Sequence, residues 1–238
     1  MAFGPDTRVA RGQVAAERVD EGLRSFMLQV YNYMGLGLAL TGVVAFFVAA
    51  TPALYEPIFG TPLKWVVMLA PLGFVFFLSM KIQSMSLSTA QLTFWAFAAV
   101  MGLSMASIFL VFTGASIARV FFITAGMFGA MSLYGYTTKR DLSAWGSFLF
   151  MGLIGIIIAM LVNLFLQSSA LQFAISVIGV LVFTGLTAYD TQQIKEMYYE
   201  LDASDIAGKK ALMGALRLYL DFINMFMMLL HLFGQTRE

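Results

Sequence analysis

Cysteine is absent from the 238-residue sequence, histidine occurs once, and charged side chains are few. The absence of cysteine excludes disulfide bonds, thiolate metal sites and a cysteine nucleophile. The net charge is +1, so no overall electrostatic field would attract nucleic acid, and we expect no nucleic-acid partner. The sequence also lacks an H-E-x-x-H motif, a phosphate-binding loop and a recognisable nucleophile–base pair. We therefore expect neither an enzyme nor a resident cofactor.

Hydrophobic residues, by contrast, dominate the sequence. They make up 60% of the chain, and charged residues make up only 11%. A soluble domain usually carries about 25% charged residues. The 17 methionines and 23 phenylalanines suit lipid-facing and helix-packing surfaces better than a single water-soluble core. This composition indicates an integral membrane protein in contact with membrane lipids.

Seven apolar segments are separated by short loops that contain proline, glycine or polar residues. Each segment is close to the roughly 20 residues that a helix needs to cross about 30 Å of hydrocarbon. None alternates with period two, as the strand of a membrane barrel would. The sequence thus predicts an all-α membrane protein, a seven-transmembrane-helix bundle; six spans plus a re-entrant segment is the alternative. The segments cover residues 27–50, 63–81, 91–112, 116–136, 145–166, 171–193 and 211–232.

We divide the chain into an N-terminal tail (1–25), a membrane domain (26–234) and a short C-terminal tail (235–238). The first tail mixes acidic and basic residues and lacks the apolar core of a signal peptide. It predicts either a short interfacial helix or disorder up to about residue 18. With a cytoplasmic N-terminus, only three of the 14 lysines and arginines, Lys64, Arg119 and Arg237, fall outside. This bias predicts a cytoplasmic N-terminus and, with seven spans, an external C-terminus.

Two aspartates lie inside predicted spans, Asp190 in the sixth and Asp221 in the seventh. Asp190 precedes Lys195 by about 7 Å along a helix, and Asp221 follows Arg217 by about 6 Å. If both basic residues mark the cytoplasmic interface, the two carboxyl groups lie at the same depth on antiparallel helices. The sequence therefore predicts that they face one another.

Ionisable groups inside a membrane are costly unless they are paired, hydrated or protonated, which makes these aspartates candidates for a functional site. Two adjacent carboxyl groups titrate as a unit; they can share one proton or offer oxygen ligands to a passing cation such as Ca²⁺. The structural alternative is a local pair between Asp221 and Arg217. Because Arg217, Asp221, Asn224, Met228 and His231 recur at helical spacing on one face, we predict a polar path along a central seventh helix.

Other polar residues give weaker indications of function. His231 either anchors the outer end of the seventh span or pairs with Glu56 as an outer latch. Lys81 either approaches the carboxyl pair or extends to the interface. Asp141 either caps the helix that follows it or contributes to gating. The methionines near the C-terminus, without cysteine, do not indicate a copper site.

Four stretches occur in an order that resembles one known family. They are "MLAPLGFVFF", "SLYGYTTKRDLS", "GVLVFTGLTAYDTQQIKE" and "LYLDFINMF". The likeness covers about residues 24–234, and its most specific parts are the motifs around Asp190 and Asp221. On these motifs the sequence resembles the Bax inhibitor-1 (TMBIM) family, in its bacterial branch.

The resemblance implies a seventh helix enclosed by the others and a di-aspartyl pH sensor at Asp190 and Asp221. It implies a pH-sensitive calcium leak channel, here in a bacterial inner membrane. Some family members place an arginine of the second span beside the dyad, where this sequence offers only Lys81. Some bacterial relatives bind and modulate a membrane-bound AAA protease.

Three functions thus remain open from the sequence. The first is a Ca²⁺ leak gated by the aspartates, for which Ca²⁺ is the permeant ion. The second is a non-conducting regulator that binds a membrane-bound protease or another membrane partner through its charged N-terminal tail. The third is a proton-coupled transporter. A single chain suffices for a path through one bundle, and the sequence leaves the oligomeric state open.

Overall fold

The computed structural model describes residues 5–237, and the side chains of residues 20–237. Seven of its helices are long and apolar enough to cross a membrane, and they coincide with the seven predicted segments. A short helix, α2, follows the first of them, and a 3₁₀ turn, η1, follows the second. The helices are α1 (Pro5–Ala49), α2 (Pro52–Phe59), α3 (Leu63–Lys81), η1 (Ile82–Ser84), α4 (Leu87–Val111), α5 (Gly114–Thr137), α6 (Ser143–Leu166), α7 (Ser169–Glu196) and α8 (Ser204–Phe233).

The helix starts follow from local sequence. Ser86, Thr113 and Ser168 are N-caps whose side-chain oxygens accept backbone N–H groups of the first turns of α4, α5 and α7. The tight turn between α6 and α7 uses Gln167 in the left-handed conformation, with φ 48°. The Asn163 side chain stabilises this turn by accepting the N–H of Ser168 at 2.9 Å. Such caps satisfy terminal backbone groups that lipid could not satisfy.

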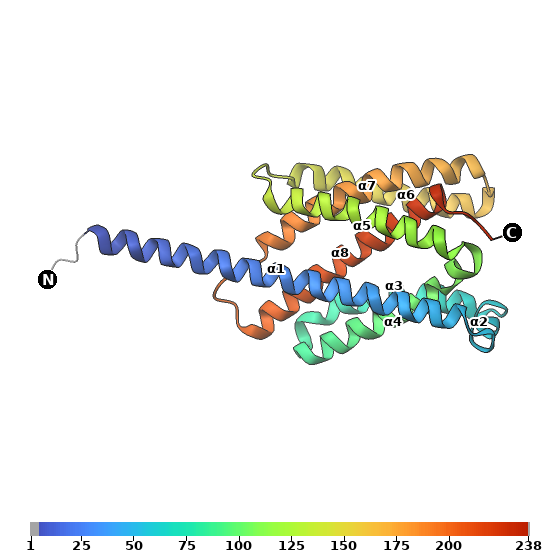
Figure 1. Ribbon diagram of the computed structural model, residues 1–238, viewed down its shortest axis with the longest axis horizontal. Coiled ribbons are helices and arrows are strands. Elements are labelled where there is room, and N and C mark those ends of the chain that lie inside the picture. The colour runs from blue at the N-terminus through green and yellow to red at the C-terminus, as the bar shows by residue number, and fades with distance from the viewer. Residues whose placement is uncertain (1–4, 238) are drawn as a thin grey trace.

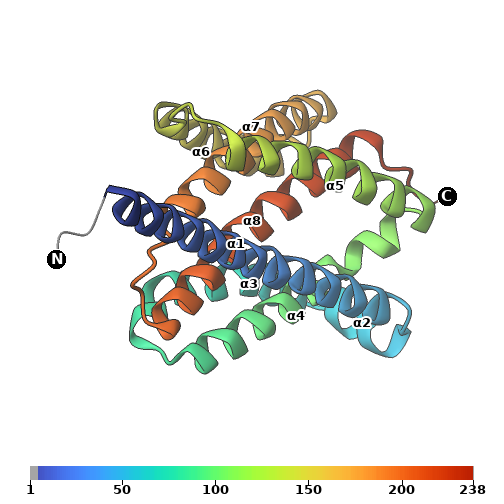
Figure 2. The same cartoon turned by 60° about the vertical axis from the view of Figure 1, so that its left-hand side comes forward.

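The last helix lies between two groups of three helices (Figures 1 and 2). On one side α1 and α4 pack against α8, with α3 outside α4; on the other, α5 and α7 pack against α8, with α6 outside α7. In the most apolar 18-residue window of α8, 61% of the residues are buried, whereas in the corresponding window of α6 only 11% are buried. The prediction of a central seventh span is confirmed, but four helices rather than six supply most of its contacts.

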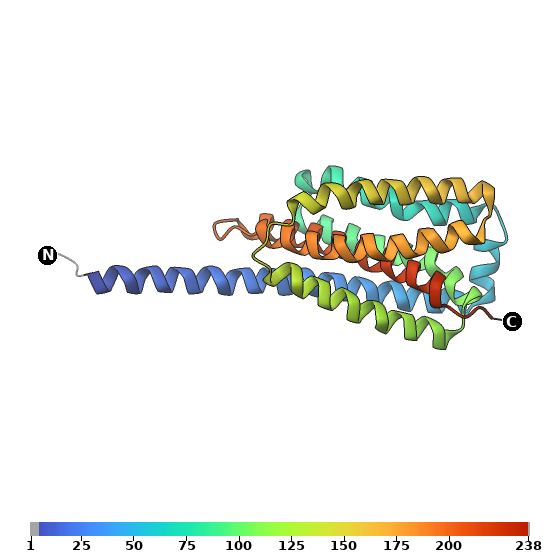
Figure 3. The same ribbon diagram turned by 90° about the horizontal axis from the view of Figure 1, so that it is seen from above.

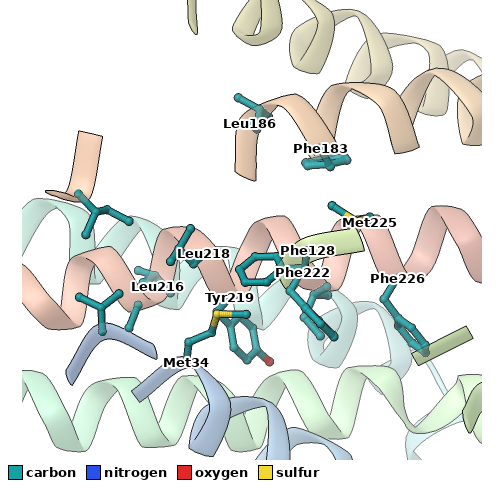
Figure 4. Packing of buried hydrophobic residues seen from close by; sticks show 14 of the residues in the cluster. Met34, Phe128, Phe183, Leu186, Leu216, Leu218, Tyr219, Phe222, Met225 and Phe226 are labelled. Atoms are coloured by element: carbon teal, nitrogen blue, oxygen red, sulfur yellow. The ribbon is translucent and has the colours of Figure 1, made fainter. Parts of the chain in front are cut away.

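Aromatic side chains fill the space between α8, α1 and α4. Tyr219 is fully buried, and its ring lies edge-on to Phe97 with 5.2 Å between centroids. Its hydroxyl is 2.6 Å from Thr41 Oγ1 of α1, which in turn donates to the carbonyl of Ala98 in α4. Figure 4 shows Tyr219 and Phe222 directed toward α1 and α4, while Phe183 approaches α8 from α7. One side of α8 is thus tied to its neighbours by packing and by buried hydrogen bonds.

Helical structure extends beyond both ends of the predicted first span. Helix α1 runs without a break from Pro5 to Ala49, so within the described residues no break separates the predicted tail from the membrane domain. Its N-terminal part projects well beyond the bundle (Figures 1 and 3). After it, the predicted loop contains the extra helix α2, which begins at Pro52 because the first turn needs no N–H from that residue. The re-entrant alternative is wrong, since α8 is one continuous helix of 30 residues.

Candidate functional site

The two intramembrane aspartates meet. Asp190, on α7, and Asp221, on α8, have carboxyl groups within hydrogen-bonding reach of each other. Asp221 is only 5% exposed, and its Oδ2 accepts no N–H or O–H from the residues that the structure describes. Either carboxyl group can donate a hydrogen bond to the other only when it carries a proton itself. A hydrogen bond between the two carboxyl groups therefore requires one proton.

Arg217 lies one turn before Asp221 and interacts electrostatically with both carboxyl groups. It does not form a direct ion pair with either, because within residues 20–237 the one ion pair joins Lys210 to Asp202, 2.6 Å apart. The local Arg217–Asp221 pair, the structural alternative, is thus not formed. Arg217 is exposed and contributes positive charge near the dyad without neutralising either aspartate by contact.

A cavity of about 500 Å³ opens onto the carboxyl pair. It is lined by three helices, and most of its wall is apolar. Its polar lining comes from the predicted face of α8, from Tyr189 and Asp190 of α7 and from Ser147 of α6, so Arg217, Asp221 and Asn224 do share one space. The Asn224 amide nitrogen donates to the carbonyl of Leu220 at 2.8 Å, which leaves its oxygen as an acceptor. The lining residues are Gly146, Ser147, Phe150 and Leu153 of α6, Phe183, Leu186, Tyr189 and Asp190 of α7, and Arg217, Leu220, Asp221 and Asn224 of α8.

The polar path predicted along α8 ends at Asn224. One turn further on, Met228 is buried against Gly179 of α7, where a Cβ would lie 2.8 Å from its Cγ and 2.9 Å from its sulfur. His231 is exposed beyond this contact, on the far side from the cavity. At this level, beyond the dyad, the Met228 side chain therefore fills the space between α7 and α8.

The predicted outer latch is wrong. His231 Nδ1 lies 2.7 Å from the carbonyl oxygen of Met227, and its ring meets the edge of Phe112 at 6.4 Å between centroids. Glu56 is exposed on α2 and forms no ion pair with it in the described part of the chain. The histidine thus contacts its own helix and Phe112, the residue that follows α4.

Two further candidates lie away from the dyad. Lys81 is exposed at the end of α3, a helix that packs on α4, and it does not line the cavity. Asp141 lies one residue before the N-cap of α6 and accepts the N–H of Ser143 at 2.8 Å. This hydrogen bond lowers the pKa of Asp141 below its ordinary value of 3.8. Asp141 thus hydrogen-bonds to the start of α6, but the N-cap itself is Leu142 and not Asp141 as predicted.

Sequence analysis missed the hydrogen bonds that fix α7 immediately after Asp190. The hydroxyl of Thr191 lies 3.0 Å from that of Ser132 in α5, which lies 2.7 Å from that of Tyr31 in α1. The buried side chain of Gln192 donates to the carbonyl of Arg140 and accepts the N–H of Leu142, each at 2.8 Å. The adjacent polar letters "DTQQ" were the only available signal, because the partners come from distant segments.

The fold and the site together define a class: a polytopic helical membrane protein with a carboxyl pair between its last two helices. The family model described as "Inhibitor of apoptosis-promoting Bax1" matches residues 23–238. The chain therefore belongs to the Bax inhibitor-1 family, which confirms the resemblance seen in its motifs.

Similar proteins come from several bacteria. The uncharacterised protein RP147 of Rickettsia prowazekii is 52% identical over 219 residues, which cover 92% of this chain and 93% of the relative. Inner membrane protein YbhL of Escherichia coli is 51% identical, with 91% and 94% covered. An uncharacterised protein of Caulobacter vibrioides is 45% identical over 230 residues, which cover 92% of each chain. The likeness extends over nearly the full length of each.

Proposed function

We propose that the protein is a pH-sensitive Ca²⁺ leak channel of the bacterial inner membrane, gated by Asp190 and Asp221. The observation that carries the proposal is the contact between these two carboxyl groups at the wall of a cavity within the membrane bundle. The inner-membrane location is supported by the name of the Escherichia coli relative. Cytoplasmic placement of the N-terminus is supported by the distribution of lysine and arginine.

Protonation gives the dyad two states. With one proton, the carboxyl groups share a hydrogen bond that links α7 to α8. Without it, two negative charges at hydrogen-bonding distance repel one another and favour either separation or capture of a cation. Because Met228 and Gly179 close the space between the same two helices, a change in helix separation at Asp221 also changes that closure.

Calcium suits the dyad as a passing ion rather than a resident one. Ca²⁺ takes about six to eight oxygen ligands, and the cavity offers two carboxyl groups, the amide oxygen of Asn224 and the hydroxyl of Ser147. An ion at the dyad must therefore keep several of its waters. Weak, hydrated binding of this kind is compatible with conduction, which requires that the ion leave as readily as it enters.

Calcium uptake into proteoliposomes tests the proposal. Wild type should show uptake above that of empty liposomes, and the uptake rate should change with pH. We would measure it over about pH 5–8, because folded proteins are usually most stable in that range. Asp190→Asn and Asp221→Asn should each remove that pH dependence. Glu196→Gln, an exposed carboxylate near the end of the same helix, is the matched control and should behave as wild type. An unchanged pH profile in both asparagine variants would refute gating by the dyad.

The second candidate is a non-conducting regulator that binds a membrane-bound AAA protease or another membrane partner. The observation that favours it is the N-terminal part of α1, which projects from the bundle as a helix available for contact (Figure 3). Deleting residues 1–22 should abolish partner binding if this function holds and leave Ca²⁺ uptake intact if the channel holds. Absence of uptake at every pH would favour the regulator and leave the aspartates with a packing role.

A further inference from the structure

A second large cavity lies between α1 and α5. Its volume is about 570 Å³, within the roughly 300–1,000 Å³ range of small-molecule sites. It shares no lining residue with the dyad cavity. Its floor is closed where Tyr31 of α1 and Ser132 of α5 meet through their hydroxyl groups. It is therefore separate from the dyad cavity.

The walls of this groove are apolar and face the bilayer. Met27 and Phe128 are buried, whereas Leu28 and Leu133 are 52% and 63% exposed, so the groove opens sideways between two membrane spans. A Cβ added at Gly129 would meet no atom within 4 Å, which shows open space along the wall of α5. In a bilayer, a groove of this kind is filled by hydrocarbon. The matching ligand is therefore an acyl chain.

Basic side chains mark one end of the groove. Arg24 lines it together with Tyr136, and Lys195 donates to the Tyr136 carbonyl at 2.9 Å with its Nζ 5.4 Å from the Tyr136 ring centre. Asp20 and Glu21 precede Arg24 on α1, but across residues 20–237 neither Arg24 nor Lys195 belongs to an ion pair. Two cations whose charges no carboxylate neutralises by contact thus stand where the apolar walls end.

We propose that the groove binds one anionic phospholipid of the phosphatidylglycerol type. Its acyl chain lies along Leu28, Gly129 and Leu133, and its phosphate lies beside Arg24, with Lys195 adding positive charge. The order of the groups matches a lipid, because the apolar wall lies inside the span and the cations lie at its end. Arginine is suited to phosphate recognition by its planar, fork-like donors.

The test uses the full-length protein in nanodiscs that contain equal parts of phosphatidylglycerol and phosphatidylethanolamine. Lipids that stay bound after detergent extraction are identified by native mass spectrometry. The wild-type protein should retain phosphatidylglycerol in preference to phosphatidylethanolamine. Arg24→Gln should reduce that preference about fivefold, the effect of one basic residue near an anionic lipid surface. Gly129→Leu should remove retention, because its side chain would fill the groove.

Gly155→Leu is the matched control for the filled groove. Gly155 also has open space at its Cβ but lies on α6, outside this groove, so the variant should retain lipid as wild type does. If Gly129→Leu fails to fold, Leu28→Trp fills the same space from the other wall. Equal retention of both lipids by wild type, or equal retention by Gly129→Leu and Gly155→Leu, would overturn the proposal. Displacement by sn-glycerol 3-phosphate, which has no acyl chain, would also overturn it in favour of a soluble phosphate site.

Discussion

The close crossing of α5 and α7 at Gly135 yields a quantitative prediction. A Cβ at Gly135 would collide with the carbonyl oxygen of Ala188 and would lie 2.9 Å from its carbonyl carbon and 3.0 Å from its Cα. These are backbone atoms, which cannot rotate out of the way. Gly135→Ala should therefore force the two helices apart two residues before Asp190. Overpacking of this kind costs about 1–3 kcal/mol of unfolding free energy.

Gly129→Ala is the matched control on the same helix. Its Cβ meets nothing within 4 Å, so it receives only the gain in helix propensity, up to about 1 kcal/mol. Because Gly135→Ala receives the same gain, the difference between the two variants isolates the collision. We would measure the free energy of unfolding by SDS titration in mixed micelles. It should be about 1–3 kcal/mol lower for Gly135→Ala than for Gly129→Ala. Equal stability, within about 0.5 kcal/mol, would show that α5 and α7 do not approach this closely.

Three smaller perturbations test other contacts. Gln192→Leu should leave two backbone groups of the α5–α6 loop without partners and lower the free energy of unfolding by about 1–3 kcal/mol. Trypsin should then cleave the loop at Lys139 faster than in wild type. An unchanged cleavage rate contradicts this prediction. Tyr219→Phe should lower the free energy of unfolding by about 0.5–1.5 kcal/mol, because it removes a buried hydrogen bond to α1. Stability equal to that of wild type contradicts this prediction. Asp141→Ala should lower the melting temperature near neutral pH. Since the pKa of Asp141 is lowered on folding, the difference should shrink as the pH falls below 3.8, and a constant difference refutes the role of the ionised carboxylate.

The membrane spans were predictable because hydrocarbon imposes one simple requirement on each. A spanning helix must be apolar over about 20 residues, and this is visible in the sequence without knowledge of its neighbours. Helix ends were less predictable. The polar segment that ends at Glu196 and the one that begins at Ser204 extend α7 and α8 beyond their apolar stretches, because backbone hydrogen bonds continue the helix into water.

The carboxyl pair was predictable from depth, because α7 and α8 are consecutive and antiparallel, so that distance from the shared end places both aspartates. The burial of α8 followed from its polar residues, which would be costly against lipid. What depth cannot give is which faces of two helices meet. The contact of Met228 with Gly179 and the partners of Gln192 depend on helix rotation and on distant segments. The same limit explains the error at His231, which topology alone placed on the same side as Glu56, whereas its ring contacts the carbonyl of Met227 and the edge of Phe112.

The central claim is that Asp190 and Asp221 act as one proton-dependent unit that controls Ca²⁺ flux. The most direct test is a mutant cycle in proteoliposomes: Ca²⁺ uptake against pH for Asp190→Asn, Asp221→Asn and the double variant. Residues that act as a unit give non-additive effects. Our account predicts that each single variant loses the pH dependence of uptake and that the double variant changes it no further. Additive effects, or pH dependence that survives in the double variant, would contradict the claim.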